Sequence, residues 1–161
     1  MDWSLLFSSY GSVFTNLQVI MMTFLGALGG VLLGAIPGMT ATMGVALLIP
    51  FSFGMDLIPS VGLLLGIYCG GMYGGSISAI TLNPPGTNSA IATTFDGYPL
   101  AKKGKLKKAL DPSLFASVFG GLFSAVLLLL CASLITKLVA NFTSVEYFSL
   151  GIMGISLIAG V

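Results

Sequence analysis

Uncharged apolar runs separated by short polar breaks follow one another along the chain. Three runs, 17–36, 57–73 and 113–136, are long enough to cross a bilayer as helices. A helix rises about 1.5 Å per residue, so about twenty residues reach the roughly 30 Å of the hydrocarbon core. The pattern therefore predicts an all-α, polytopic transmembrane protein.

A shorter run, 40–53, is apolar but too short for a comfortable crossing. It ends at Pro50 and a turn over residues 53–56, and predicts a short or re-entrant helix. Its depth in the membrane stays open at this point.

Two still shorter runs, 76–83 and 87–95, follow a break at Gly74-Gly75 and are joined by Pro84-Pro85-Gly86. Arms of about eight residues would each reach roughly 12 Å, near the middle of a bilayer. We therefore expect a re-entrant hairpin, and so a fold with broken helices. The alternative is one long helix to Leu82 followed by an external loop.

The two ends of the chain give further predictions. Aromatic residues recur at helical spacing from Trp3 to Phe14, which predicts an interfacial helix over residues 1–15. The last apolar run, 147–161, is too short to span. We expect residues 1–161 to be a single membrane-embedded region that forms the N-terminal portion of a longer protein.

Composition supports a lipid environment and excludes other classes. Apolar residues make up 56% of the chain and charged residues 7%, whereas soluble domains carry about 25% charged residues. A net charge of +1 lacks the basic field that nucleic-acid binding uses. With no histidine, Cys69 and Cys131 are interpreted as buried small hydrophobic residues, and no metal site or cofactor is expected.

Five lysines fall within residues 102–108. Because cytoplasmic loops carry an excess of basic residues, we predict that residues 96–112 form a cytoplasmic loop. Turn residues 96–99 would open this loop, and Pro112 would begin the next helix. A polybasic segment that binds lipid or nucleic acid is the alternative.

Glycine recurs every fourth residue in two series. Gly26, Gly30, Gly34 and Gly38 are repeated thirty-six positions later by Gly62, Gly66, Gly70 and Gly74. In lipid, small residues at this spacing let helix backbones approach closely. Static packing is one interpretation of the two series. A surface on which helices slide, or along which substrate approaches the backbone, is the other.

Each glycine series leads to a Pro-Gly break followed by polar side chains, at Pro37-Gly38 and Pro85-Gly86. Irregular backbone at membrane depth persists only where it is buried in protein or lines a cavity, and paired breaks point to a transporter's binding site. A helix that starts after such a break offers free N–H groups to an anion. The candidate substrate-binding residues are Gly38, Thr40, Thr42, Asn83, Gly86, Thr87, Asn88 and Ser89.

Weaker candidates exist for a cation. Free carbonyl groups at the breaks, together with hydroxyls, suit a sodium ion, and Thr93, Thr94 and Asp96 are candidate ion ligands. The alternative for all these polar groups is helix capping and hydrogen bonding between helices.

Three stretches resemble the large membrane subunit of tripartite tricarboxylate transporters, the TctA family. They are residues 34–38 leading to 47–50, residues 66–76, and Asn83-Pro84-Pro85-Gly86-Thr87 continuing through 93–101 to Gly104. The clear motifs cover about residues 20–110, and the family's large subunit is about three times as long as this chain.

The resemblance implies a secondary transporter of the bacterial inner membrane that takes up citrate or related carboxylates, coupled to a cation such as Na+. It also implies two partners, a small TctB-like membrane subunit and a TctC-like periplasmic substrate-binding protein. A structural, glycine-packed subunit without a substrate site is the alternative function. An intramembrane serine hydrolase around Ser76 is a further one, but no histidine is present to act as its base, so we expect no enzyme.

Overall fold

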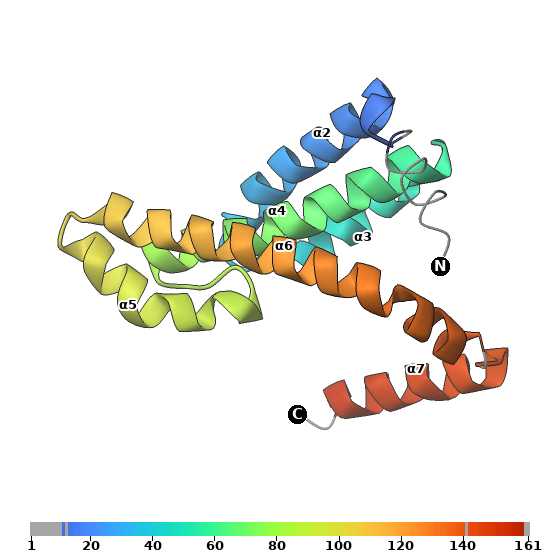
Figure 1. The fold of residues 1–161 in the computed structure, drawn as a ribbon. Helices are drawn as coiled ribbons and strands as arrows, with labels where there is room; N and C mark the ends of the chain where they lie inside the picture. The colour runs from blue at the N-terminus through green and yellow to red at the C-terminus, as the bar shows by residue number, and fades with distance from the viewer. Residues whose placement is uncertain (1–10, 12, 141, 160–161) are drawn as a thin grey trace. The chain divides into compact units, whose positions relative to one another are not determined.

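The computed structural model describes residues 11, 13–140 and 142–159, and every regular element in these ranges is helical. The elements in chain order are α2 (Leu17–Gly34), α3 (Ala41–Ser52), α4 (Leu57–Leu82), the 3₁₀ turn η1 (Asn88–Ala90), α5 (Ile91–Lys102), α6 (Leu106–Val139) and α7 (Ser144–Ala159) (Figure 1). The chain divides into two compact units, within residues 2–118 and 119–161, which are described separately. Most of the predicted interfacial helix, residues 1–15, lies outside the described residues.

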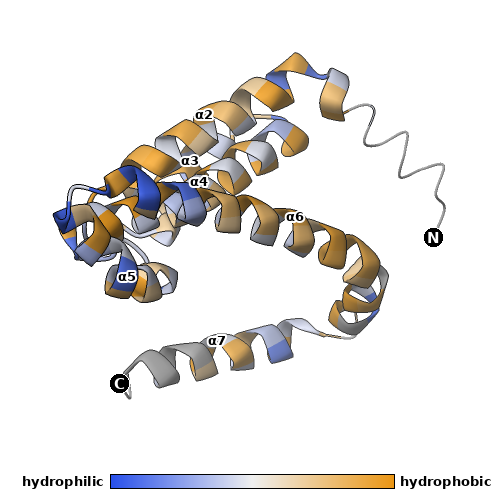
Figure 2. Ribbon diagram, turned by 60° about the vertical axis from the view of Figure 1, so that its left-hand side comes forward, coloured by the Kyte–Doolittle hydropathy of each residue, from blue (hydrophilic) through white to orange (hydrophobic). Residues whose placement is uncertain are grey.

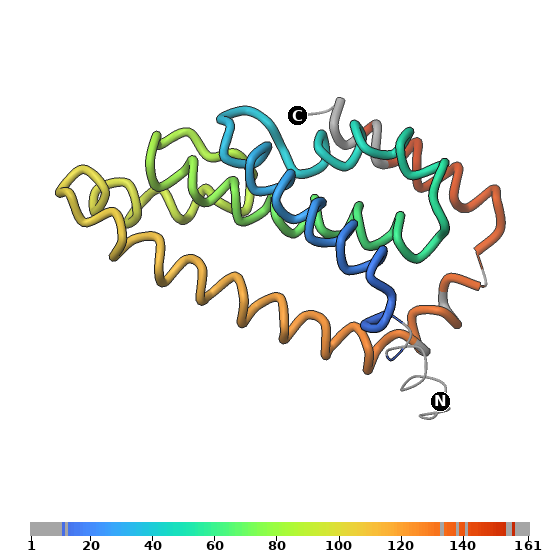
Figure 3. Tube along the Cα trace, turned by 90° about the horizontal axis from the view of Figure 1, so that it is seen from above, coloured from blue at the N-terminus to red at the C-terminus, as the bar shows by residue number. Residues whose placement is uncertain are grey.

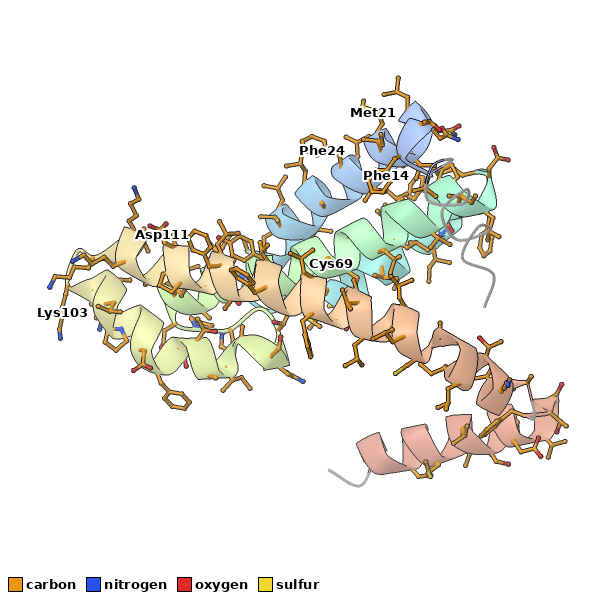
Figure 4. All side chains as sticks on the ribbon, in the orientation of Figure 1. Phe14, Met21, Phe24, Cys69, Lys103 and Asp111 are labelled. Carbon is orange, nitrogen blue, oxygen red and sulfur yellow. The ribbon has the colours of Figure 1, made fainter. Side chains whose placement is uncertain are left out.

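Three of the described helices are long and apolar enough to cross a membrane, namely α2, α4 and the Leu106–Ala132 part of α6. Figure 2 shows these helices coloured largely as hydrophobic. On α2, Met21 and Phe24 are 50% and 59% exposed and project outward from the helix (Figure 4). Apolar side chains this exposed on long helices are expected in lipid. The chain is therefore an all-α polytopic membrane protein, as the hydropathy pattern predicts.

Helices α2 and α4 pack backbone to backbone at Gly26, Gly30 and Gly34 of the first glycine series and at Gly66, Gly70 and Gly74 of the second. Gly38 lies beyond α2, where an added Cβ would meet nothing within 4 Å, and one on Gly62 would meet the Thr23 side chain. A Cβ added to Gly30 would lie 2.8 Å from the backbone nitrogen of Gly71, and one added to Gly74 would lie 2.9 Å from that of Ala35. Because glycine has no Cβ, the two helices approach more closely than any other residue would allow. The prediction of tight helix contacts is confirmed.

The same contacts show that α2 and α4 run in the same direction (Figure 3). Gly26 near the middle of α2 lies against Leu63 of α4, and Gly34 at the end of α2 lies against Gly71. Parallel neighbours need a connection that returns the chain to its starting side. Here that connection is α3.

Helix α3 is short and antiparallel to α4. Ala41 at its start lies against Gly71, whereas Gly44 lies against Ile67, one turn earlier on α4. A short helix over 40–53 is thus confirmed, but Pro50 does not end it, since α3 continues to Ser52. Proline has a φ that fits a helix but removes one hydrogen bond. Because only two residues of α3 follow Pro50, the helix loses little there and continues to Ser52.

The predicted break at Gly74-Gly75 is wrong, because α4 is continuous to Leu82. The alternative of one long helix to Leu82 is correct for this segment. Both glycines are buried, Gly74 against Val31 of α2 and Ala35 just after it, and Gly75 against Thr87. Tight packing on this face offsets the helix-weakening effect of glycine.

The predicted loop over 96–112 is also mostly helical. Residues 96–99 lie inside α5, and only residues 103–105 separate α5 from α6. Gly97 is buried against Ile80 of α4, so packing overrides the local turn preference. Pro112 likewise lies inside α6, which begins at Leu106.

In the unit within 119–161, the rest of α6 is followed by α7. Helix α7 begins with a capping arrangement in which the backbone N–H of Thr143 donates to a Glu146 carboxylate oxygen over 2.6 Å, and the Thr143 hydroxyl donates to the same oxygen. A threonine followed three residues later by glutamate is the capping-box pattern. The rings of Phe142 and Tyr147 lie 5.9 Å apart and brace this start.

Candidate functional site

The first Pro-Gly break forms the turn between α2 and α3. Gly38 has a φ of 85°, a conformation that glycine adopts without steric cost. Thr40 then caps α3, since its hydroxyl oxygen accepts a hydrogen bond from the Met43 N–H over 3.3 Å. The Thr40 hydroxyl also shares a 2.9 Å hydrogen bond with the hydroxyl of Thr42. Both hydroxyls therefore gather at the start of α3.

The second break turns the chain back along α4. Asn83 ends α4 with a φ of 79°, and within three residues Gly86 lies buried beside Gly75. The Gly86 N–H donates to the Gly75 carbonyl oxygen over 3.4 Å. A Cβ added to Gly86 would lie 2.9 Å from the Gly75 Cα and would also meet the carbonyl oxygen of Gly34. The end of α2 and the second Pro-Gly break are thus in direct contact.

A cavity of about 160 Å³ lies where the two breaks meet. Its walls come from the start of α3, the middle of α4 and the η1 turn that precedes α5. The lining residues are Thr40, Ala41, Thr42, Tyr68, Met72, Thr87, Asn88 and Ser89. A space of this size holds several water molecules or a carboxylate group.

Six of the eight side chains that line this cavity carry a hydroxyl or an amide group, and none is charged. Thr87 is 6% exposed, and its hydroxyl shares a 3.1 Å hydrogen bond with the Ser89 hydroxyl. The Ser89 hydroxyl also donates to the Met72 sulfur over 3.5 Å. Helix α3 and the η1 turn both begin at this cavity. The Met43 N–H at the start of α3 already donates to Thr40, but the first N–H groups of a helix in general have no partner within it and favour an anion. Chemically, the arrangement can hold an anion without an arginine or a lysine.

The structure brings together five of the predicted substrate-binding residues, Thr40, Thr42, Thr87, Asn88 and Ser89. Gly86 lies behind them in the packed contact with α2 and α4. Gly38 is exposed in the turn before Thr40, and Asn83 is exposed at the end of α4, so neither lines the cavity.

The weaker ion candidates lie further along α5. Thr93 and Thr94 are half-buried, and the Thr94 hydroxyl donates to the Ile91 carbonyl oxygen over 2.6 Å. Asp96 is exposed. None of the three lines the cavity.

Sequence reasoning missed three lining residues, Ala41, Tyr68 and Met72. Tyr68 and Met72 are four residues apart and share one face of α4, inside the 66–76 motif. The sequence signal that could have identified them is the four-residue spacing of a tyrosine and a methionine within a glycine-rich helix. Their position opposite the break became evident only from the packing of α4 against α3 and η1.

No cluster of three His, Cys, Asp or Glu side chains able to hold a metal occurs among the described residues. Cys69 and Cys131 are free thiols. Their interpretation as buried is wrong, because Cys69 is exposed on α4 (Figure 4) and Cys131 is only half-buried. On a membrane helix an exposed small apolar residue faces lipid or another helix, not water.

The cavity lies part of the way along α4, not at an end. Its contacts on α4 centre on residues 68–75, whereas α4 begins at Leu57 and ends at Leu82. At 1.5 Å per residue, Gly75 is about 10 Å from the end of α4 and about 27 Å from its start. The cavity therefore lies away from both ends of a helix that is long enough to cross a membrane.

Comparison of the sequence with known proteins identifies the family of the chain. The sequence model described as "Tripartite tricarboxylate transporter TctA family" matches residues 20–161, a longer stretch than the motifs alone cover. A 52.8 kDa uncharacterized protein of Agrobacterium vitis, described as lying in the TAR-I ttuC' 3' region, is 38% identical over 136 residues.

That alignment covers 84% of this chain and 27% of the Agrobacterium protein, so the chain spans about a quarter of the relative's length. No solved structure matches the chain. The family match includes both Pro-Gly breaks and all the residues that line the cavity. The chain belongs to the tripartite tricarboxylate transporter TctA family.

Proposed function

We propose that the chain is part of the large membrane subunit of a secondary transporter that takes up citrate, another tricarboxylate or a related carboxylate. Its partners are a small membrane subunit and a periplasmic substrate-binding protein, and a cation, Na+ in the simplest form, drives uptake. The protein works in the bacterial inner membrane and is not an enzyme. Family membership supports the transporter class.

One observation supports a substrate-binding role for specific residues. Two chain breaks forty-eight positions apart meet at an uncharged cavity lined by hydroxyl and amide groups, inside the length of a membrane-crossing helix. Polar groups in hydrocarbon are costly, so their collection at one point favours a binding site. The starts of α3 and of the η1–α5 segment provide N–H groups for a substrate carboxylate.

The direction of the helices suggests how the site is reached. If the lysines of 102–108 lie on the cytoplasmic side, as the positive-inside rule favours, α4 starts on the periplasmic side. The α2–α3 hairpin then enters from the periplasmic side. The segment from Asn83 to Thr87 is re-entrant from the cytoplasmic side. The cavity lies between the two, as alternating access requires.

The test is carboxylate uptake by the complete transporter reconstituted in proteoliposomes. Thr42→Ala and Ser89→Ala each remove a hydroxyl from the cavity wall, and each should lower uptake at least tenfold while assembly is unchanged. Ser52→Ala is the matched control. Its hydroxyl is on the same helix as Thr42 but donates only to the Ile49 carbonyl oxygen at the far end, so uptake should be unchanged. Wild-type uptake by both cavity variants would reject the site.

A second experiment separates a transporter from a structural subunit without a substrate site. Single cysteines replace Thr42 and, as a control, Ser52, in a complete transporter from which every native cysteine, Cys69 and Cys131 included, has been removed. Citrate with Na+ should slow alkylation at position 42 and leave position 52 unaffected. Equal alkylation rates with and without substrate at both positions would favour the structural role.

A further inference from the structure

A second cavity, of about 290 Å³, lies in the same compact unit but away from the site described above. It is formed by the last turn of α4, the second half of α5 and the first residue of α6. Its lining residues are Thr81, Tyr98, Ala101, Lys102 and Leu106. None of them lines the first cavity.

This second cavity lies at the boundary between apolar and charged chain. Between Asp56 and Asp96 the sequence has no charge, and α4 ends at Leu82, one residue after Thr81. The lysine-rich segment 102–108 begins at the cavity wall, and Figure 2 shows the hydrophilic colour concentrated at the junction of α5 and α6. Leu82 and Leu106 are 55% and 40% exposed beside it. Headgroups of a bilayer lie at such a boundary.

The charge at this cavity is positive and not neutralised. In the part of the chain that the structure describes, the five lysines of 102–108 have no carboxylate partner. The Lys102 ammonium nitrogen lies 4.9 Å from the centre of the Tyr98 ring, so a cation–π contact holds this charge at the cavity wall. Lys103 is exposed as Lys102 is, but it lies in the α5–α6 connection and does not line the cavity (Figure 4).

We propose that this cavity is a headgroup site for an anionic phospholipid. The Lys102 ammonium pairs with the phosphate, the Tyr98 hydroxyl donates a hydrogen bond to a phosphate oxygen, and the acyl chains lie along the exposed apolar surface near Leu82 and Leu106. The Thr81 hydroxyl already donates to the Ile77 carbonyl oxygen over 2.7 Å, so Thr81 only shapes the cavity wall. Charge complementarity selects an anionic lipid over a zwitterionic one, whose own ammonium group would meet the neighbouring lysines. The remaining lysines add attraction without belonging to the cavity.

The test is native mass spectrometry of the purified protein in neutral detergent, titrated with phosphatidylglycerol, with phosphatidylcholine, or with inorganic phosphate. Wild-type protein should retain phosphatidylglycerol preferentially. Lys102→Gln should weaken its binding about fivefold, the effect of one lysine near an anionic headgroup. Lys107→Gln is the matched control, since it removes the same charge from the same segment outside the cavity, and it should weaken binding by less than twofold.

Three outcomes would overturn the proposal. Equal loss in the two lysine variants would mean that diffuse charge, not the cavity, attracts lipid. Equal retention of phosphatidylcholine would remove the role of the headgroup charge. Displacement of the lipid by millimolar inorganic phosphate would assign the cavity to a free anion. Circular dichroism of each variant checks that helix content is unchanged, which the exposed position of both lysines leads us to expect.

Discussion

The backbone N–H of Gly86 donates a hydrogen bond to the carbonyl oxygen of Gly75 across 3.4 Å. This contact joins the second Pro-Gly break to the last third of α4. It also places Gly86 against the last residue of α2, Gly34. The cavity depends on this arrangement, because Thr87, Asn88 and Ser89 follow directly in the chain.

We therefore expect Gly86→Ala to disrupt the site. The new Cβ would lie 2.9 Å from the Gly75 Cα and 3.0 Å from the Ser78 hydroxyl oxygen, and backbone cannot move aside cheaply. Overpacking of this kind costs about 1–3 kcal/mol. Thermal unfolding in detergent should show the loss, and uptake should fall with it. Gly121→Ala on α6, where nothing lies within 4 Å, is the control, and an equal loss there would contradict the prediction.

The contact between α2 and α4 predicts different effects on stability for alanine substitutions at two adjacent glycines, Gly30 and Gly29. Gly30→Ala directs a methyl group into the Ile67 carbonyl and the Gly71 backbone nitrogen, so the helices must separate and stability should fall by about 1–3 kcal/mol. Gly29→Ala meets nothing within 4 Å and should leave stability unchanged or slightly higher. The unfolding midpoints of the two variants measure the difference. Similar midpoints would argue against the glycine contact as the basis of this packing.

Asn83 should matter through its backbone, not its side chain. With a φ of 79° and a ψ of −41° at the end of α4, it occupies a conformation that lies outside the left-handed helical region and that glycine adopts most readily. Asn83→Gly should therefore preserve both stability and uptake. Asn83→Val should cost about 1–3 kcal/mol from backbone strain. Loss of uptake in the glycine variant, with stability intact, would instead assign the amide group to substrate binding.

The start of α7 should respond to acid. Hydrogen bonds from the Thr143 hydroxyl and backbone N–H stabilise the charged carboxylate of Glu146 and hold its pKa below the usual range. A group with a lowered pKa in the folded protein contributes stability above its ordinary pKa, and that contribution disappears as the pH falls through the lowered value. Amide hydrogen exchange at Thr143, corrected for the intrinsic pH dependence, should therefore accelerate in strong acid.

Glu146→Gln provides the control for this effect. Its amide oxygen still accepts a hydrogen bond but does not titrate, so exchange at Thr143 should be somewhat faster than wild type near neutral pH. It should also lack the acid-dependent step. An acid-dependent step in the glutamine variant would show that another group is responsible.

The sequence by itself determined the class of the protein and the chemistry of its candidate site. Long uncharged runs require helices in lipid, since only hydrogen bonds within a helix satisfy the backbone there. Glycine at every fourth position required close helix contact, and the absence of room for a Cβ at Gly30 and Gly74 confirms it. Five residues of the cavity wall were identifiable because hydroxyl and amide groups after a Pro-Gly break are unusual in an apolar chain.

Tertiary structure alone decided where the helices continue and which residues face one another. Gly74-Gly75 and the residues from Asp96 to Pro99 have the local preferences of breaks and turns, but both stretches are helical because Gly74, Gly75 and Gly97 are buried against neighbouring elements. Local propensities of about 1 kcal/mol per residue are smaller than the packing gained on such a face. The parallel course of α2 and α4, and the place of Tyr68 and Met72 in the cavity wall, depend on contacts between distant segments, which no local pattern encodes.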